Sequence, residues 1–341
     1  MSAIESLTMP NTYVRLMLQT AQDPQQILVG SGLSAEQVRQ DSADIEVWQQ
    51  LVCARNSAAV SRSPHWHLNW ADRIAEHFHG PVTAAWLSAP TLGDGLDIFV
   101  RYIPDRAPYL SFRSVRATET WQVELRSLME LGDIAAMLIE LPLLTLAIYI
   151  HRLLGKRVDG LRLQFPHQPL AGLEHYRRLF HGELTFEAPV AALSLPAAYR
   201  NLANPGYDRT MWNAARRRCE AAAQGRATHT IINRVVEVLF NSLDEQSPER
   251  VLPTLSGMAK QLHISVSTLN RRLRAANITY QALLDDVRSQ RAKELLSNPQ
   301  RRVVDIAHEL GFRDTTSFVR SFKRWYGTTP GRYRRRIDGV H

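Results

Sequence analysis

Hydrophobic positions in the first part of the chain recur with the spacing of helices. Apolar residues return every three or four positions over 12–22, 43–59 and 91–103, which predicts three amphipathic helices. The stretch 131–154 is almost continuously apolar and predicts a long, mostly buried helix, which Pro142 would kink. The N-terminal part is therefore expected to be rich in helix.

Strand signals follow between these helices. Residues 109–115 and 118–125 are rich in β-branched and aromatic side chains with partial alternation, which predicts a strand pair. Together with the helices, they predict an α+β fold for the N-terminal domain. The other elements predicted here are strands over 161–165, 184–186 and 190–195 and a helix over 170–180.

From residue 208 onward the periodicity is helical only, which predicts an all-α C-terminal domain. Helices are expected over 208–224 and 230–243, and Gly225 between them predicts a hinge. The predicted organisation is an N-terminal domain at 1–207, a connecting helix and hinge at 208–228 and a C-terminal domain at 229–341.

Residues 255–275 predict a short helix, a turn at His263 and a second helix that Ser265 can cap. Leu269 and Leu273 point inward from the second helix because they are four positions apart. The opposite face then carries side chains that suit the major groove of DNA, where Arg pairs with guanine and Asn with adenine. These outward residues are Ser267, Asn270, Arg271 and Arg274.

Residues 303–325 repeat this helix-turn-helix design. Gly311 supplies a left-handed residue after the first helix, and Asp314 can cap the second. A helix predicted over 280–296, about 25 Å long, lies between the two units. Such a rod is long enough to hold two recognition helices on successive major grooves, about 34 Å apart. The buried stripe expected on the last helix is Phe318, Phe322 and Trp325.

The charge of the chain is concentrated in this helical part. Residues 251–341 hold 17 Lys and Arg against 7 Asp and Glu, whereas residues 1–228 hold 22 of each. This asymmetry favours a polyanion as partner, although a basic surface that only aids solubility gives the same count. Several basic side chains are expected to contact phosphates, with a solvated tail as the alternative for the terminal run. They are Arg272, Arg274, Lys323, Arg324, Arg332, Arg334 and Arg335.

The two units together, over 251–335, resemble the DNA-binding domain of the AraC/XylS family of bacterial transcription regulators. The resemblance lies in DIAHELGF at 305–312, RSFKRW at 320–325, GTTP at 327–330 and, in the first unit, STLNRRL at 267–273. It implies two helix-turn-helix subdomains joined by a linker helix, which bind promoter DNA. The base-reading positions that the family implies are Ser267, Asn270, Arg271, Thr315, Thr316 and Arg320.

Two positions depart from the family pattern. Asn277 stands where the family usually has Gly, but Asn tolerates a positive φ, so the turn should survive. Val319 stands where a small polar residue is more usual, which weakens any polar contact with DNA at that point.

Two stretches of the N-terminal domain, 88–112 and 163–199, resemble the arabinose-binding-type N-terminal domain of one AraC subgroup. The resemblance implies a module that senses a small-molecule effector and can form a homodimer, without naming the effector. An apolar pocket is the usual site for such a molecule, although each apolar candidate equally suits the hydrophobic core. The candidates are Phe112, Trp121, Tyr149 and Phe165, with Arg101 and Arg113 to pair a ligand carboxylate.

Other chemistries find weaker support. The pairs His65–His67 and His77–His79 raise the alternative of a metal site, but neither has the i, i+4 spacing of one helix face. Histidines on loops or at the surface are the favoured interpretation, and no metal or cofactor is expected. No nucleophile elbow, phosphate loop or dinucleotide fingerprint occurs, so neither catalytic residues nor an enzyme activity are expected.

The N-terminus lacks the basic and apolar segments of a signal peptide, and Cys53 and Cys219 are too few for a disulfide framework. The apolar stretch 134–150 contains Glu140 and falls short of the ~20 residues that span a bilayer. We therefore expect a cytoplasmic protein with no membrane partner.

The predicted function is an effector-controlled transcription regulator that binds promoter DNA and positions RNA polymerase. The family resemblance favours activation over repression. A nucleoid-type DNA-binding protein, whose N-terminal domain only dimerises, is the alternative. An enzyme tethered to DNA is a further alternative, for which the sequence offers no acid–base cluster.

Overall fold

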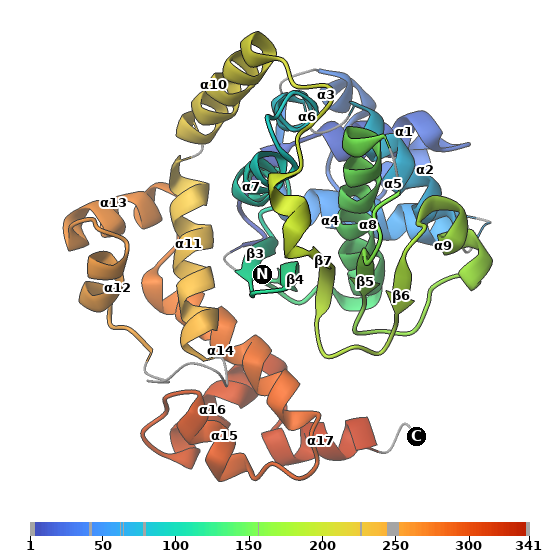
Figure 1. Ribbon diagram of the computed structural model, residues 1–341. Coiled ribbons are helices and arrows are strands. Elements are labelled where there is room, and N and C mark those ends of the chain that lie inside the picture. The colour runs from blue at the N-terminus through green and yellow to red at the C-terminus, as the bar shows by residue number, and fades with distance from the viewer. Residues whose placement is uncertain are drawn as a thin grey trace. The chain divides into compact units, whose positions relative to one another are not determined.

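The computed structural model describes residues 4–40, 43–61, 63, 65–77, 80–155, 157–225, 227–243 and 252–338 (Figure 1). The chain divides into two compact units, an N-terminal unit up to Ala227 and a C-terminal unit from Thr228 onward. The N-terminal unit combines helices with sheets, and the described part of the C-terminal unit is helical. Both fold classes predicted from the sequence are confirmed.

Helices dominate the first part of the N-terminal unit. α1 (Thr12–Thr20), α4 (Val47–Val60) and α7 (Leu92–Tyr102) form where the apolar spacing predicts them. Thr91 caps α7, since its hydroxyl accepts a hydrogen bond from the amide of Asp94. The shorter helices are α2 (Pro24–Leu28), α3 (Ala35–Arg39), α5 (Trp66–His77) and α6 (Pro81–Leu87).

The residues before α4 correct one prediction. A helix was expected from residue 43, but Asp44–Glu46 form strand β2, which pairs antiparallel with β1 (Thr8–Pro10). Ile45 is buried opposite Met9. A pairing between segments far apart in the sequence therefore outweighs the helical spacing of the local sequence.

A five-stranded sheet forms the second part of the unit, in the order β3-β4-β7-β5-β6. Neighbouring strands are antiparallel except β5 and β6, which are parallel and joined through α9 (Leu173–Leu179). The predicted strand pair is β3 and β4, with Phe112 opposite Leu125. The strands are β3 (Leu110–Arg116), β4 (Thr120–Ser127), β5 (Arg162–Gln164), β6 (Glu183–Thr185) and β7 (Ala191–Pro196).

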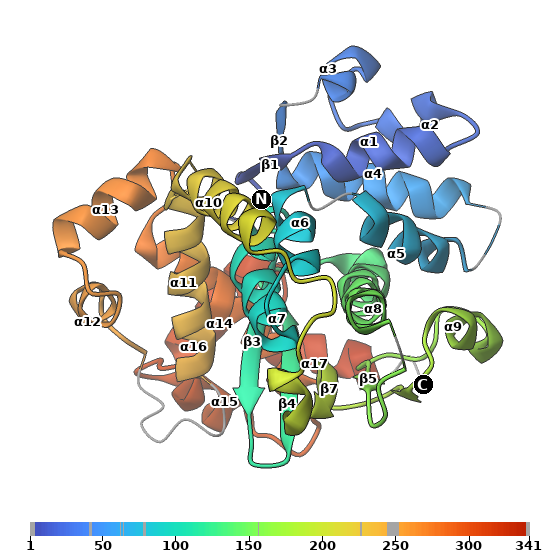
Figure 2. The same cartoon turned by 45° about the horizontal axis from the view of Figure 1, so that its top comes forward.

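Helix α8 (Ala135–Leu154) is the central helix of this unit and runs through Pro142 without interruption. It lies between α5 and the sheet (Figure 2). Gly132–Leu154 is the one helical stretch among the described residues with the length and apolarity to cross a membrane, and 72% of its most apolar window is buried in the protein. This burial is the expected property of a core helix.

Helix α10 (Arg209–Gly225) packs against α6, with Ala215 and Cys219 in the same buried cluster as Val82 and Ala85. Gly225, where the hinge is predicted, is the last residue of α10, and Arg226 after it lies outside the described residues. The C-terminal helices are α11 (Ala227–Ser242), α12 (Leu255–Gln261), α13 (Val266–Ala275), α14 (Tyr280–Leu296), α15 (Val303–Glu309), α16 (Thr315–Tyr326) and α17 (Pro330–Asp338).

Candidate nucleic-acid interface and ligand cavity

In the first helix-turn-helix unit, backbone hydrogen bonds and a side-chain cap position α13 after α12. His263 has a φ of 55°, and its amide and that of Ile264 donate to carbonyls in the last turn of α12. Ser265 then caps α13, because its hydroxyl accepts a hydrogen bond of 3.1 Å from the amide of Thr268. The start of the recognition helix is thus fixed.

Burial decides which face of α13 is available. Leu269 and Leu273 are buried, as their spacing predicts. Ser267 and Arg271 on the opposite side are exposed, and Asn270 is half-buried. The three base-reading candidates of the first unit therefore lie outside the core on one short helix.

The second unit has the same construction with different residues. Gly311 has a φ of 71°, and its amide and that of Phe312 donate to carbonyls in the last turn of α15. Asp314 caps α16 by accepting hydrogen bonds from the amide and the hydroxyl of Ser317, at 2.7 and 2.9 Å. These bonds, the amide bond first, hold the pKa of the Asp314 carboxyl below its ordinary value.

Helix α16 has a buried face and an exposed face, as predicted, with one difference. Phe318 and Phe322 are fully buried, but Trp325, expected in the same stripe, is half-buried. Of the base-reading candidates, Thr316 and Arg320 are exposed and Thr315 is half-buried.

The linker helix α14 is bonded directly to the turn of the second unit. The guanidinium group of Arg288 donates to the carbonyls of Leu310 and Gly311, at 2.9 and 3.0 Å, and lies 4.6 Å from the ring centre of Phe312. Burial lowers the pKa of Arg288. At the other end of α14, the hydroxyl of Tyr280 donates to the carbonyl of Pro253, ahead of α12.

The phosphate-contact candidates fall into two groups. Arg324 forms an ion pair of 2.7 Å with Asp285 of α14, and half-buried Arg334 donates to the carbonyl of Leu296 at 3.3 Å. These two arginines therefore also make contacts within the protein. The other candidates are exposed, except for half-buried Arg272: Arg272, Arg274, Lys323, Arg332 and Arg335.

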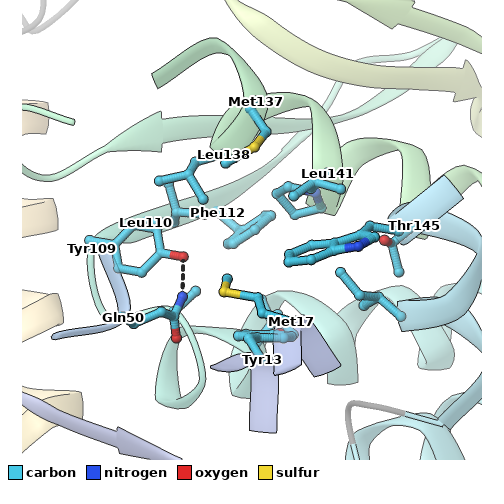
Figure 3. Close-up of a pocket in the computed structure, with 15 residues that line it drawn as sticks. Tyr13, Met17, Gln50, Tyr109, Leu110, Phe112, Met137, Leu138, Leu141 and Thr145 are labelled. Atoms are coloured by element: carbon cyan, nitrogen blue, oxygen red, sulfur yellow. Dashed lines mark hydrogen bonds between the residues drawn. The ribbon is translucent and has the colours of Figure 1, made fainter. Parts of the chain in front are cut away.

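The N-terminal unit contains an apolar cavity of about 50 Å³ (Figure 3). Leu138, Leu141 and Thr145 of α8 form part of its wall. Gln50 of α4 lies at the other side, where its amide nitrogen donates to the hydroxyl of Tyr109 at 2.9 Å. The cavity is therefore almost entirely apolar with a few fixed polar groups, as small-molecule sites usually are.

Of the aromatic pocket candidates, Phe112 lines this cavity and the other three do not. Trp121 is buried, and its indole N–H donates to the hydroxyl of Ser114 at 2.7 Å. The hydroxyl of Tyr149 shares a hydrogen bond of 2.8 Å with that of Thr83. Phe165 packs against Phe186, with ring centres 5.4 Å apart.

The two arginine candidates also lie apart from the cavity. Arg113 pairs with Glu124 on the neighbouring strand through hydrogen bonds of 2.6 and 3.0 Å. Arg101 is exposed at the end of α7, with its guanidinium group 5.3 Å from the ring centre of Tyr102. Neither side chain lines the apolar cavity.

Sequence reasoning missed the cavity residues that come from α1, α4 and α5, among them Tyr13, Gln50 and Trp70. One signal for α5 was present, since Trp66, Trp70 and Ile74 follow each other at steps of four residues. Nothing in the local sequence marks Gln50 as a cavity residue, because the cavity is made by tertiary packing.

The histidines proposed for loops or the surface require a correction. His67 lies on α5, is 2% exposed and forms a hydrogen bond of 2.8 Å with Glu140 of α8. The hydroxyl of Tyr176 on α9 donates to both oxygens of the same carboxylate, at 2.7 and 2.9 Å. Burial and the Glu140 charge raise the pKa of Tyr176. This buried network ties three helices together.

The described residues give no support to the alternative of a metal site. His65 stacks on His175, with ring centres 3.8 Å apart, and does not join His67 in a ligand set. In the second pair, His79 and the side chain of His77 lie outside the described residues. Within the described residues, no group of three metal-ligating side chains is arranged to hold an ion.

Comparisons with known proteins match both units. Residues 22–204 match the family model of the arabinose-binding domain of AraC transcription regulators, and residues 258–336 match that of a helix-turn-helix domain. The ornithine utilization regulator of Pseudomonas aeruginosa is 29% identical over 286 residues, 82% of this chain and 81% of that protein. The virulence regulon transcriptional activator VirF of Shigella flexneri is 32% identical over 79 residues, 23% of this chain and 30% of VirF.

Among solved structures, the transcriptional regulator CdpR from Pseudomonas aeruginosa covers 95% of this chain and 96% of its own, with 21% identity and a TM-score of 0.43. The match to the arabinose-binding-domain model covers more than half of the chain, and the helix-turn-helix match lies beside it. The chain therefore belongs to the AraC family of helix-turn-helix transcription regulators, in the group with an arabinose-binding-type N-terminal domain.

Proposed function

We propose that α13 and α16 each enter a major groove of promoter DNA and read base edges there. One observation carries this proposal: both helices are fixed by a capping side chain and a buried stripe, which leaves polar side chains outward. Arg and Asn at such positions can pair with guanine and adenine. The residues assigned to base reading are Ser267, Asn270, Arg271, Thr315, Thr316 and Arg320.

The remaining basic side chains of the C-terminal unit supply phosphate contacts. Such contacts add affinity and salt dependence without sequence information. Lys323 and Arg332 are exposed, whereas Arg324 pairs with Asp285 and Arg334 donates to the carbonyl of Leu296, so we expect Lys323 and Arg332 to contribute more to binding.

Substitutions on a selected binding site test this division. A site is first isolated by repeated selection of random DNA on the full-length protein. Arg271→Ala and Arg320→Ala should each lower affinity for this site 5- to 150-fold, about 1–3 kcal/mol, and relax base preference at one position. Lys323→Ala is the matched control, which should weaken selected and random DNA alike and reduce the salt slope by about one. If the Arg variants also lose affinity equally on all DNA, the base-reading assignment is wrong.

The N-terminal unit is proposed to bind a small-molecule effector in its cavity region. The effector changes transcription only if it binds one arrangement of the protein more tightly than another. We place the boundaries of the sensing, connecting and DNA-binding parts at 1–207, 208–228 and 229–341. The complete proposal is a cytoplasmic activator without enzyme activity that contacts RNA polymerase, with the N-terminal unit as its homodimerisation element.

Thermal unfolding of the full-length protein against a metabolite panel tests the sensor. A ligand that binds only the folded protein raises its stability by RT ln(1 + [L]/Kd). The panel includes L-ornithine, because one relative is named for ornithine utilization. A metabolite that raises Tm and also changes affinity for the selected DNA supports effector control. Failure of every metabolite favours a DNA-binding protein whose N-terminal unit only dimerises.

A further inference from the structure

Two cavities of the N-terminal unit share part of their walls. Met17 of α1 and Trp70 of α5 line the apolar cavity of about 50 Å³ and also line a second cavity of about 370 Å³. We call the second one the polar cavity. The rest of its wall comes from the end of α1 and the connection to α2, from α2, from the last part of α4, from residues that follow α4 and from the start of α5. The two spaces therefore adjoin at Met17 and Trp70.

The polar cavity differs from the apolar cavity in the groups it offers. Six of its lining residues carry a hydroxyl or amide group, and the carboxylate of Asp23 already caps α2 by accepting a hydrogen bond from the amide of Gln25. No Lys, Arg or His is among the described residues that line it. The hydroxyl and amide residues are Thr20, Gln22, Gln26, Ser57, Ser61 and Ser63.

One side chain in this wall lacks a partner. Ser57 is 5% exposed, and its hydroxyl oxygen has no hydrogen-bond partner among the described residues. A buried polar group left unpaired carries a desolvation cost that a native protein rarely retains without a reason. A bound molecule with a hydrogen-bonding group in the polar cavity would remove this cost.

We infer that the effector is an uncharged amphiphile that occupies both cavities. Its hydrogen-bonding end lies in the polar cavity and bonds the Ser57 hydroxyl, and its apolar end passes Met17 and Trp70 into the apolar cavity. That cavity has room for on the order of four water-sized groups, so the apolar end is a short chain. Met17 can turn aside because its thioether chain is flexible. This inference rests on the proposed role of the N-terminal unit as the effector-binding part.

Probes that share a six-carbon skeleton and differ in charge test the ligand class. Thermal unfolding of the full-length protein is measured with hexanamide, hexanoate and hexylammonium at equal millimolar concentrations. Hexanamide should raise Tm, and the two ions should raise it less. The hexanoate measurement also tests for an ion pair with Arg62. This residue stands between Ser61 and Ser63 in the sequence and lies outside the described residues. A larger shift with either ion would overturn the assignment of an uncharged ligand.

A pair of serine variants tests the binding position. Ser57→Ala should raise Tm without ligand, because it removes an unpaired buried hydroxyl, and should weaken hexanamide binding roughly fivefold. Ser88→Ala is the control, since buried Ser88 lines neither cavity and its hydroxyl already donates to the carbonyl of Ala84 at 2.6 Å. Calorimetric Kd values for both variants are compared with that of the unmodified protein. Equal Kd values for Ser57→Ala and the unmodified protein would remove Ser57 from the site and overturn the inference.

Different results would contradict effector control and the two-cavity site. A metabolite that stabilises the protein but binds Ser57→Ala with unchanged affinity contradicts the two-cavity site and leaves effector control standing. Absence of any stabilising compound, across the six-carbon probes and the metabolite panel, contradicts effector control and the two-cavity site together.

Discussion

The two helix-turn-helix units use the same backbone turn with different residues. In each, a residue with positive φ follows the first helix. Its amide and that of the next residue donate hydrogen bonds to carbonyls in the last turn of that helix. The first unit has His263 at this point and the second has Gly311. A Cβ atom at Gly311 would lie 3.1 Å from Leu252 and 3.3 Å from the Arg288 guanidinium group. Packing of Leu252 and the linker helix over the turn, in addition to the backbone conformation, therefore favours glycine in the second unit.

The cores below the two recognition helices also differ. α13 rests on two leucines, whereas α16 rests on Phe318 and Phe322. The Phe322 ring lies 5.4 Å from that of Tyr333 on α17 and 4.8 Å from that of Tyr326. The second unit is thus held by an aromatic cluster and by Arg288, and the first by a smaller apolar contact. We expect the second recognition helix to be the more firmly fixed of the two.

The largest effect is expected from the aromatic cluster. Phe322→Ala should lower the free energy of unfolding by about 3–5 kcal/mol, because it leaves a cavity among several rings. Leu269→Ala in the first unit should cost less, near the lower end of the ~2–5 kcal/mol range for such changes. Urea unfolding of the full-length variants measures both. Equal losses would contradict the difference drawn between the two cores.

Substitutions at the two turns should change the stability of the protein in opposite directions. His263→Gly should stabilise the protein by up to about 1 kcal/mol, because it relieves a left-handed residue that carries a Cβ atom. Gly311→Ala should destabilise it by about 1–2 kcal/mol, because it adds such a residue beneath Leu252. Differential scanning calorimetry compares both with the unmodified protein. A Gly311→Ala variant as stable as the parent would show that Leu252 and Arg288 move aside freely.

The smallest expected effect is a pH dependence of stability that distinguishes the Asp314 cap of α16 from the Ser265 cap of α13. The pKa of the Asp314 carboxyl is lower in the folded protein than its ordinary value near 3.9. Its ionised form therefore stabilises the protein at pH values above the ordinary pKa. This stabilisation is lost as the pH falls through the lower pKa of the folded protein. Asp314→Asn keeps a capping side chain but removes this titration. The stability difference between parent and variant should therefore change between pH 5 and pH 3 in urea unfolding. Ser265→Asn, at the uncharged cap of the first unit, should show no such change, and a change there would point to another group.

The C-terminal elements were predictable because their signals are local. Ser265 and Asp314 each stand next to the helix they cap, and α13 and α14 have the bounds that the apolar spacing predicts. The N-terminal unit was harder because its features depend on long-range contacts. Strand β2 forms through pairing with β1, and the cavity joins Tyr13, Gln50 and Phe112 from three separate elements. Local patterns mark such residues as buried without showing what they face.

The Glu140 network has a consequence for the order in which the chain folds. The carboxylate is fully buried, and its partners His67 and Tyr176 lie on helices that precede and follow α8 in the chain. Until both partners are in place, burying α8 would leave the Glu140 carboxyl group without these hydrogen bonds, which costs free energy. A nascent chain that ends before residue 176 therefore lacks a stable place for its most apolar helix. The N-terminal core should accordingly be completed only after α9 has been synthesised.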